Sequence, residues 1–403
     1  MSEKSIIEKI KRDGLCLGCG LCESVCGKDS VEMRLQKNGF FLPEIKSLNA
    51  DKEKVINEIC PGINIVNDLS FGKDEKIWGR IEELRSGYST DAEVRFHGSS
   101  GGIISAIAIH ALSTGKVDAV LQVGGDSADF ERNTLKISKS RHDVLECASS
   151  RYAPALIFDK IFEILESSNE VYCFIGKPCD ISALKNFLNV YPIYKSRFKL
   201  YVSIMCAGMP SFNGTKEIIN NLGANEPVNN LTYRGDGWPG YFSFADNQGQ
   251  QFKMSYNDSW GNTLNRFLNF RCKLCPDGIG LQADIAVGDA WDTKDGYPDF
   301  SEKDGLSLVI ARTKAGVEVL TDAQTEGSMC FEELPHFKLA QMQPYQYARR
   351  SRVGARVLAY ILVKQRTLRF KHLRVWKNLI GVSPVDLLKE FMGTFRRSIK
   401  YRS

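Results

Sequence analysis

The sequence predicts three parts: a small cysteine-rich α+β module, an α/β core domain with a mixed or parallel sheet, and a basic helical tail. Cysteines crowd the first 70 residues, apolar strand-like runs alternate with helical segments over 87–340, and residues 345–403 are rich in Lys and Arg. We therefore expect a module at 1–70, a linker at 71–86, the core domain at 87–340 and the tail at 341–403.

Composition and charge exclude several classes of protein. The 403 residues are 43% hydrophobic and 25% charged, with a net charge of +5, which is typical of a globular chain of two or three domains. Residues 345–403 carry 15 Lys+Arg and 2 Asp+Glu (+13), so the remainder, with 38 Lys+Arg and 46 Asp+Glu, carries −8. A protein whose main body is acidic is not expected to bind nucleic acid.

The cysteine content indicates metal or redox chemistry. The chain has 12 cysteines, its first 14 residues lack the apolar segment of a signal peptide, and no run of 18 apolar residues predicts a transmembrane helix. We therefore expect a cytoplasmic protein, in which cysteines bind metals or react more often than they form disulfides.

Strand-like runs in the core each end at a Gly or Cys. They are Val117–Val123, Val171–Ile175, Leu200–Met205 and Ala283–Val287, and helical patterns occupy Ile103–Leu112 and Ile181–Leu188. Because parallel strands place their carboxyl ends at one edge of a sheet, we expect ligands to bind at that edge. The tail should hold two helices, the second beginning at Ser383 and Pro384, a good N-cap and a good first residue.

The first cysteine set follows the bacterial ferredoxin spacing. Cys16, Cys19, Cys22 and Cys26 form C-x2-C-x2-C-x3-C, in which the first three thiolates serve one cluster and the last serves another. Cys60, followed by Pro61, is the candidate fourth ligand, and Cys26 is expected to be a leftover thiol. The spacing predicts a ferredoxin-like 4Fe-4S module with ligands Cys16, Cys19, Cys22 and Cys60; a zinc knuckle is the less favoured alternative.

A second cysteine set is spread through the core. Cys179 and Cys206 follow predicted strands, and Cys272 and Cys275 form a C-x2-C pair before another. These residues can supply a second cubane or a zinc site, and separate buried thiols are the alternative. Three further cysteines are interpreted as small buried hydrophobes: Cys147, Cys173 and Cys330.

A glycine-rich turn precedes the first core helix. Ser99, Ser100, Gly101 and Gly102 lead into it, where free N–H groups suit a phosphate or a flavin carbonyl; a plain cap with packing glycines is equally consistent. Lys177 could stabilise an anionic flavin, although a surface lysine is the simpler interpretation. The candidate cofactor contacts are Ser99, Ser100, Gly101, Gly102, Lys177 and Asp289.

Together these motifs resemble the coenzyme F-420 hydrogenase/dehydrogenase beta-subunit family. The matching pieces are Ser99–Gly102, Gly176–Cys179, Cys206–Gly208, Arg271–Cys275, Ala283–Trp291 and Arg312–Gly316. The resemblance spans about residues 10–340 and implies an FAD-containing oxidoreductase with two 4Fe-4S clusters. It also implies that Cys179, Cys206, Cys272 and Cys275 are cluster ligands and that the Ser-Gly-Gly turn contacts the flavin. Lys177 departs from the family, whose members often have Thr there.

The resemblance implies electron transfer between a ferredoxin-like protein or a reduced deazaflavin such as coenzyme F-420, the clusters and FAD. The substrate is unidentified, with surface-polysaccharide metabolism as one context. The alternatives are a non-catalytic electron-relay subunit of a larger complex and a zinc-stabilised binding protein. The basic tail is expected to contact an anionic membrane or an acidic partner; the alternative is a helical pair packed on the core or on a second copy of the chain.

Overall fold

The computed structural model describes residues 5–69, 76–126, 129–294 and 297–401. The linker expected at 71–86 falls partly outside these residues, at 71–75. Its last residues, 83–86, are not a connection, because they begin strand β4 (Glu83–Ser89), which lies inside the main sheet.

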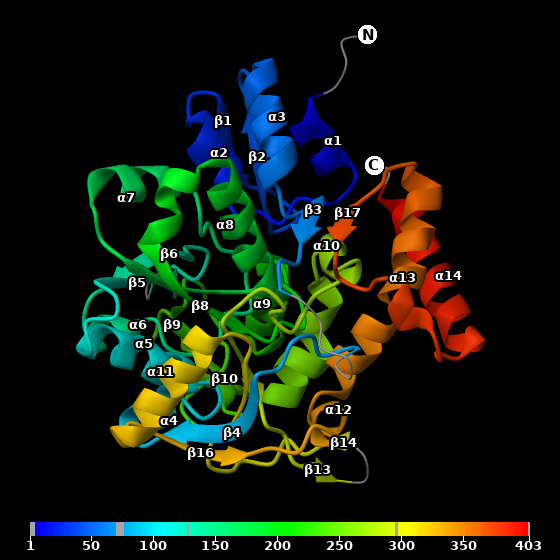
Figure 1. The fold of residues 1–403 in the computed structure, drawn as a ribbon. Helices are drawn as coiled ribbons and strands as arrows, with labels where there is room; N and C mark the ends of the chain where they lie inside the picture. The colour runs from blue at the N-terminus through cyan, green and yellow to red at the C-terminus, as the bar shows by residue number, and fades with distance from the viewer. Residues whose placement is uncertain (1–4, 70–75, 127–128, 295–296, 402–403) are drawn as a thin grey trace.

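An eight-stranded mixed sheet forms the centre of the molecule (Figure 1). Its spatial order is β16 (Met329–Glu333), β4, β15 (Ser307–Ala311), β12 (Ile285–Asp289), β8 (Phe198–Ile204), β7 (Tyr172–Gly176), β5 (Ala119–Gly124) and β6 (Thr134–Ser138). The four strands β12, β8, β7 and β5 pair in parallel, and antiparallel strands flank them on both sides. The prediction of an α/β core with a mixed sheet is confirmed.

Helices cover both faces of this sheet. On one face α5 (Ile103–Ser113) and α11 (Lys314–Thr325) bury apolar residues against β5, β7, β8, β12 and β15. On the other face α7 (Ile161–Ser167) and α8 (Pro178–Val190) pack on β5 and β7. Two short helices accompany the first layer, α4 (Ala92–His97) and α6 (Arg141–Glu146). Strands buried on both faces explain why the central runs are continuously apolar rather than alternating.

A second small sheet with its own core lies beside the carboxyl edge of the main one. It orders β11 (Gln251–Ser255), β10 (Tyr241–Ala245) and β9 (Asn229–Thr232), and α9 (Phe212–Asn221) packs on it. Short elements occur elsewhere in the core and next to this sheet: the 3-10 helices Pro192–Arg197 and Leu264–Phe267, a π-helical turn at Asn257–Thr263, α10 (Phe270–Lys273), the β13 (Thr293–Lys294) and β14 (Tyr297–Pro298) pair, and α12 (Lys338–Met342).

The N-terminal module packs above the core sheet. It contains α1 (Ile6–Arg12), α2 (Leu21–Cys26), the β1 (Val31–Leu35) and β2 (Phe41–Ile45) hairpin, α3 (Ala50–Ile59) and β3 (Asn64–Val66). α1 begins at a capping box formed by Ser5 and Glu8, as its sequence favours. Leu21, Val25 and Ile59 join the apolar cluster under α7 and α8, so module and core share buried surface.

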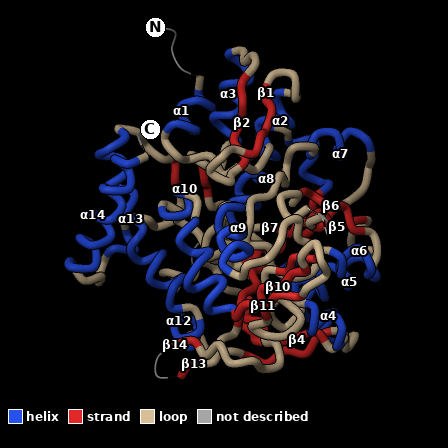
Figure 2. Tube along the Cα trace, turned by 180° about the vertical axis from the view of Figure 1, so that it is seen from behind, coloured by secondary structure: helices blue, strands red, loops and turns tan. Residues whose placement is uncertain are grey.

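The C-terminal tail contacts the N-terminal module. It contains α13 (Pro344–Lys364), β17 (Arg369–Lys371), a 3-10 turn at Lys377–Leu379 and α14 (Pro384–Lys400), which starts where the sequence predicts. β17 pairs in parallel with β3 of the N-terminal module, and α13 packs beside α14 at the edge of the molecule (Figure 2). Within the described residues, no helix has the length and apolar character needed to cross a bilayer.

Candidate functional site

The cysteines predicted to form the first cluster line one cavity of the N-terminal module. Cys16, Cys19, Cys22 and Cys60 all border it, and it encloses about 40 Å³ between otherwise apolar residues such as Ile56. No group of three or more His, Cys, Asp or Glu in the described part of the chain is gathered tightly enough for a single metal ion. Thiols that surround a volume fit a cluster of several iron atoms, whereas zinc ligands converge at about 2.3 Å.

Two glycines let the loop wrap this cavity. Gly18 (φ +68°) and Gly20 (φ +86°) adopt the left-handed backbone that other residues avoid. A Cβ on Gly18 would lie 2.8 Å from the carbonyl oxygen of Phe41, and one on Gly20 would lie 2.8 Å from the backbone nitrogen of Asp159. The Gly18 N–H also donates to Cys16 Sγ at 3.4 Å, so the turn both shapes the loop and faces the sulfur.

The thiols of this cavity need positive charge to ionise. Burial raises the pKa of the Cys16 thiol to about 12, and it also raises the pKa of Cys19, Cys22 and Cys60. Thiolates, which are the ligand form, therefore become favourable here when iron compensates their charge. Cys26 does not border the cavity, and its role as a leftover thiol stays a prediction.

The second cysteine set converges beside the carboxyl edge of the main sheet. Cys179 is the second residue of α8, Cys206 follows β8, Cys272 lies in α10 and Cys275 follows that helix. Burial is the main reason that the pKa values of Cys179 and Cys206 are raised, and the charges of Cys206 and Cys275 add to it for Cys179. Cys272 and Cys275 do the same for Cys206, for which the pKa reaches about 12. The structure therefore brings all four predicted residues into one electrostatic neighbourhood.

Helix α13 of the tail holds the Cys206 loop in place. Gln346 Nε2 donates to the Cys206 carbonyl oxygen at 3.1 Å, and an Arg349 guanidinium nitrogen donates to the same oxygen at 2.8 Å. A second Arg349 nitrogen donates to the carbonyl of Ala207. Sequence reasoning missed this role, because the arginines of α13 contributed only to the net charge of the tail.

Two residues next to the second set connect it to the first. Asn269 Nδ2 donates to the Cys16 carbonyl oxygen at 3.1 Å. Arg271, only 1% exposed, donates from Nε to the Gly62 carbonyl at 2.6 Å and from Nη2 to that of Pro61 at 3.1 Å. Because Arg271 precedes Cys272 and Pro61 follows Cys60, one buried side chain connects a cysteine of each set to the other.

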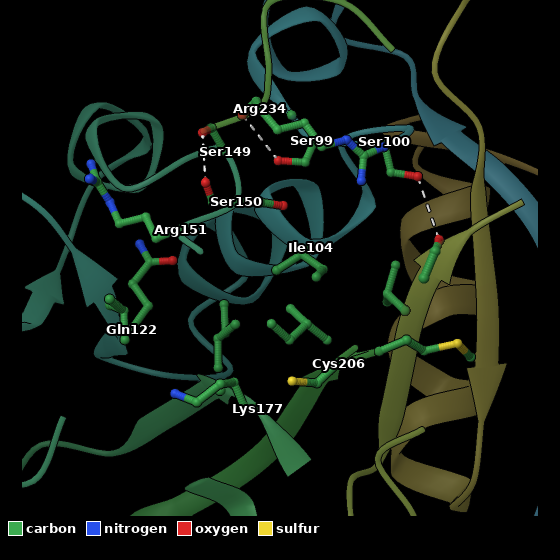
Figure 3. Close-up of a pocket in the computed structure, with 18 of the residues that line it drawn as sticks. Ser99, Ser100, Ile104, Gln122, Ser149, Ser150, Arg151, Lys177, Cys206 and Arg234 are labelled. Atoms are coloured by element: carbon green, nitrogen blue, oxygen red, sulfur yellow. Dashed lines mark hydrogen bonds between the residues drawn. The ribbon is translucent and has the colours of Figure 1, made fainter. Parts of the chain in front are cut away.

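A cavity of about 230 Å³ opens at the carboxyl ends of the parallel strands. Its lining includes residues at the ends of β5, β7, β8 and β12 and at the N-termini of α5 and α8. The residues labelled in Figure 3 surround Ile104, with Arg151 and Gln122 on one side, Ser99 and Ser100 across from them, and Lys177 and Cys206 below. The edge of the sheet predicted to bind ligands is therefore hollow.

The predicted cofactor contacts divide into three groups. Ser99, Ser100, Gly102 and Lys177 line the cavity, and Lys177 Nζ lies 2.7 Å from Asp180 Oδ2. Gly101 does not line it: its N–H donates to Ser307 Oγ at 2.9 Å, and a Cβ would lie 2.5 Å from the Gly87 carbonyl. We therefore correct its assignment from cofactor contact to packing glycine.

Asp289 borders the cavity, but its carboxylate is already occupied. Oδ2 accepts from Arg234 Nη1 at 2.9 Å, and Oδ1 accepts from Arg234 Nη2 at 2.5 Å and from Trp238 Nε1 at 2.8 Å. Arg234, which also lines the cavity, lies over the rings of Tyr256 and Trp291. Asp289 therefore orients Arg234, and Arg234 is a cavity residue that sequence reasoning missed.

Arg151 is a second missed residue of the cavity. It lines the cavity, its Nε is buried without a hydrogen-bond partner, and Nη1 reaches only Asn133 Oδ1, at 3.5 Å. No carboxylate of the described residues pairs with it, and burial lowers its pKa. Unlike Lys177 and Arg234, Arg151 is thus a half-buried cation that lacks an anionic partner among the described residues, which is the arrangement that binds a phosphate or carboxylate ligand.

Two cysteines interpreted as small buried hydrophobes differ in their placement. Cys173 is buried in β7 as expected, whereas Cys147, expected in the hydrophobic interior, caps α6 and lines the cavity. Cys206 is the one residue of the second set, among those described, that lines the cavity, so it borders both the thiol group and the hollow.

Comparison with known proteins decides the family. The N-terminal model of the coenzyme F420 hydrogenase/dehydrogenase beta subunit matches residues 85–161, and the C-terminal model matches 169–336. The chain belongs to this family. It is therefore a member of a family of oxidoreductase and electron-transfer subunits, and membership implies FAD and iron–sulfur clusters. The matched residues contain the whole cavity region and the second cysteine set, whereas the N-terminal module and the tail lie outside the two models.

Several relatives are named for coenzyme F420. A coenzyme F420-dependent sulfite reductase of Methanocaldococcus jannaschii is 20% identical over 84% of this chain and 51% of its own length, so the chain spans about half of that relative. A coenzyme F420 hydrogenase subunit beta of Methanothermobacter thermautotrophicus is 24% identical over 64% of this chain and 86% of the relative. A chain of the F420-reducing [NiFe] hydrogenase complex from Methanosarcina barkeri superposes with a TM-score of 0.55 at 20% identity, over 72% of this chain and 94% of that one, which shows a shared fold.

Proposed function

We propose that this protein is an iron–sulfur flavoprotein oxidoreductase with two 4Fe-4S sites and one FAD site. Cys206 carries the proposal, because it belongs to the second thiol group and also lines the cavity at the sheet edge. The proposed ligands are Cys16, Cys19, Cys22 and Cys60 for the first cluster and Cys179, Cys206, Cys272 and Cys275 for the second. When bound, clusters supply single electrons and a flavin exchanges electrons singly or in pairs.

The cavity has the features that a flavin dinucleotide needs. Arg151 offers a phosphate a half-buried guanidinium that pairs with no described carboxylate, and the N-termini of α5 and α8 add partial positive charge. Ser99 and Ser100 bring hydroxyl groups, and Ile104 provides apolar surface for a ring. The enclosed volume of 230 Å³ suits part of a dinucleotide rather than the whole, so the rest would lie in the mouth of the cavity.

The content of the purified protein tests this proposal first. Anaerobically purified protein should hold about eight iron and eight acid-labile sulfide atoms, from two cubanes, together with one FAD. Cys206→Ala should lower the iron content by about half, since one ligand of one cubane is lost. Cys173→Ala, in the buried interior of β7, is the matched control and should leave it unchanged. Zinc in place of iron, with no flavin, would instead support a zinc-stabilised binding protein.

The order of the sites can be tested separately. Cys179→Ser should leave FAD bound, because Cys179 does not line the cavity, but should block reduction of the flavin by reduced ferredoxin. Flavin absorbance near its oxidised maximum, followed after mixing with ferredoxin, reports this step without any substrate. Unchanged reduction kinetics in Cys179→Ser would refute a path through the second cysteine set.

A non-catalytic relay subunit is the second candidate. Relatives are named as beta subunits of coenzyme F420 hydrogenase, so those proteins act within assemblies. If this chain works in the same way, the isolated protein should accept electrons from ferredoxin or reduced coenzyme F420 but turn over no small molecule. Turnover by the isolated chain would identify it as a complete oxidoreductase.

A further inference from the structure

We propose that the outer face of α14 is a docking surface for an anionic lipid bilayer. The helix is amphipathic, and its exposed apolar stripe faces away from the rest of the molecule. Val385, Leu388, Met392 and Ile399 are 60%, 61%, 39% and 46% exposed, and their spacing of three, four and seven places them on one face of the helix. An exposed apolar stripe of this length marks a contact surface rather than an ordinary solvated helix.

The opposite face of α14 carries its polar contacts with the rest of the molecule. Arg352 Nη2 of α13 lies 2.8 Å from Asp386 Oδ2 of α14, and Arg356 Nε of α13 lies 2.8 Å from Glu390 Oε2 of α14. Thr394 and Ser398 are fully buried farther along the same side. Polar groups therefore contribute to holding the helix in place, while the stripe of Val385, Leu388, Met392 and Ile399 faces outward. Figures 1 and 2 both show α14 as the outermost element on this side, with α13 between it and the core.

The charged residues around this face indicate what binds to it. Residues 345–403 contain 15 Lys+Arg and only 2 Asp+Glu, and those two acids are Asp386 and Glu390, which are both paired toward α13. No acidic side chain of the tail is thus left to face outward. The exposed cations Lys389, Arg396 and Lys400 border the apolar stripe. An apolar stripe beside cations, with no carboxylate, matches the chemistry of an anionic membrane surface: acyl chains below and phosphate groups at the side.

The turn that precedes α14 extends the same chemistry. Ile380 is 84% exposed, Trp376 is about half exposed, and Lys377 beside them is exposed. Tryptophan with a neighbouring lysine is typical of side chains at the level of lipid headgroups. The surface therefore consists of Trp376, Lys377, Ile380, Val385, Leu388, Lys389, Met392, Arg396, Ile399 and Lys400. It would place the protein on the bilayer without crossing it.

Flotation of the full-length protein with vesicles tests the proposal. We expect it to float with vesicles of phosphatidylcholine and phosphatidylglycerol (3:1), to stay behind with pure phosphatidylcholine, and to be released by high salt. Leu388→Gln with Met392→Gln should abolish flotation. Leu358→Gln with Leu362→Gln is the matched control: this exposed i, i+4 pair lies on α13 about 160° and about 120° around the helix from Arg356, on the side turned away from α14.

The basic residues need their own variant. Lys389→Gln, Arg396→Gln and Lys400→Gln together should weaken vesicle binding about a hundredfold, since each cation near an anionic surface contributes roughly fivefold. The control has the same net charge change at exposed lysines elsewhere: Lys54→Gln, Lys195→Gln and Lys314→Gln. Equal binding by both triple variants would overturn the proposal. Failure of the wild type to float would also overturn it. A dimer or larger assembly in sedimentation that Leu388→Gln with Met392→Gln dissociates would overturn it too, because another protein chain would then cover this face.

Discussion

The two cysteine sites differ in how the chain builds them. The first comes from one continuous stretch, Cys16 to Cys60, and closes around an apolar cavity that no described charged side chain lines. The second gathers residues from Cys179 to Cys275, borders the open cavity at the sheet edge, and is fixed by Gln346 and Arg349 of the tail. The first site is thus enclosed and the second borders an open cavity, and Arg271 connects the two.

The largest expected effect is a loss of iron that distinguishes Cys16, a proposed ligand of the first site, from Cys26, which is not one. Cys16→Ser should remove one cubane, about half of the iron, because a buried hydroxyl is a poor replacement for a thiolate ligand. Cys26→Ser should retain all of it, since Cys26 lies outside the cavity. Iron and sulfide analysis with low-temperature EPR of the reduced protein measures both variants. Loss of iron in Cys26→Ser would mean that the first site is not limited to the four cavity cysteines.

Spacing identified the four thiols that line the cavity of the N-terminal module, because these cysteines are close in sequence, and their role as cluster ligands stays a prediction. The carboxyl edge of the sheet as the place of a ligand cavity was also predictable, since apolar runs ending in Gly or Cys already place Cys179 and Cys206 at one edge. The spatial order of the strands was not predicted, because it depends on contacts between residues far apart in the sequence. Arg151 and Arg234 could not be found this way. An arginine in a loop carries no periodic signal in the sequence. Arg234 and Arg151 differ in their ion pairs, because Arg234 pairs with Asp289 whereas none of the described carboxylates pairs with Arg151.

The same limit applies to the ends of the chain. The net charge of the tail was visible, but pairing of β17 with β3 depends on contacts more than 300 residues apart, for example Phe370 with Ile65. Nothing local distinguishes an arginine that reaches inward, such as Arg349, from one that faces solvent, such as Arg396. The sequence-based alternative that the tail helices pack on the core therefore describes α13, whereas the exposed stripe belongs to α14.

The next effect tests the link between the two sites. Arg271→Gln should destabilise the protein by about 3 kcal/mol, because the shorter side chain leaves the carbonyls of Pro61 and Gly62 without their buried donor. Thermal unfolding of the iron-loaded protein should show a lowered midpoint. Arg369→Gln, whose partly exposed guanidinium pairs with Glu58 at 2.7 Å, is the control at a nearby surface and should change the midpoint little. Equal midpoints for both variants would show that Arg271 does not join the sites.

A smaller expected effect is a loss of flavin affinity, which concerns only the cavity beside the second cysteine set. Arg151→Gln should weaken FAD binding about 10- to 100-fold, as expected for loss of a charge-assisted hydrogen bond of about 1.5–3 kcal/mol, while the iron content stays unchanged. Titration of flavin-depleted protein with FAD, followed by fluorescence quenching, gives the dissociation constant. Arg132→Gln, an exposed residue paired with Asp129 at 3.3 Å, should bind FAD as the wild type does. Normal FAD affinity in Arg151→Gln would assign that guanidinium to another anion.

The smallest effect compares two glycines at opposite ends of α2, both with positive φ. Gly27 (φ +84°, ψ 146°) has open space where a Cβ would lie, so Gly27→Ala should cost only the strain of a backbone conformation that favours glycine, about 1–2 kcal/mol. Gly20 (φ +86°) has the Asp159 backbone nitrogen 2.8 Å from that position, so Gly20→Ala must also push the module away from the core and should cost about 1 kcal/mol more than Gly27→Ala. Denaturant unfolding of the two variants measures the difference. Because Gly20 lies beside Cys19, Gly20→Ala should also increase the oxygen sensitivity of the first site, whereas Gly27→Ala should not. Equal stabilities would show that contact with Asp159 does not hold the cysteine loop against the core.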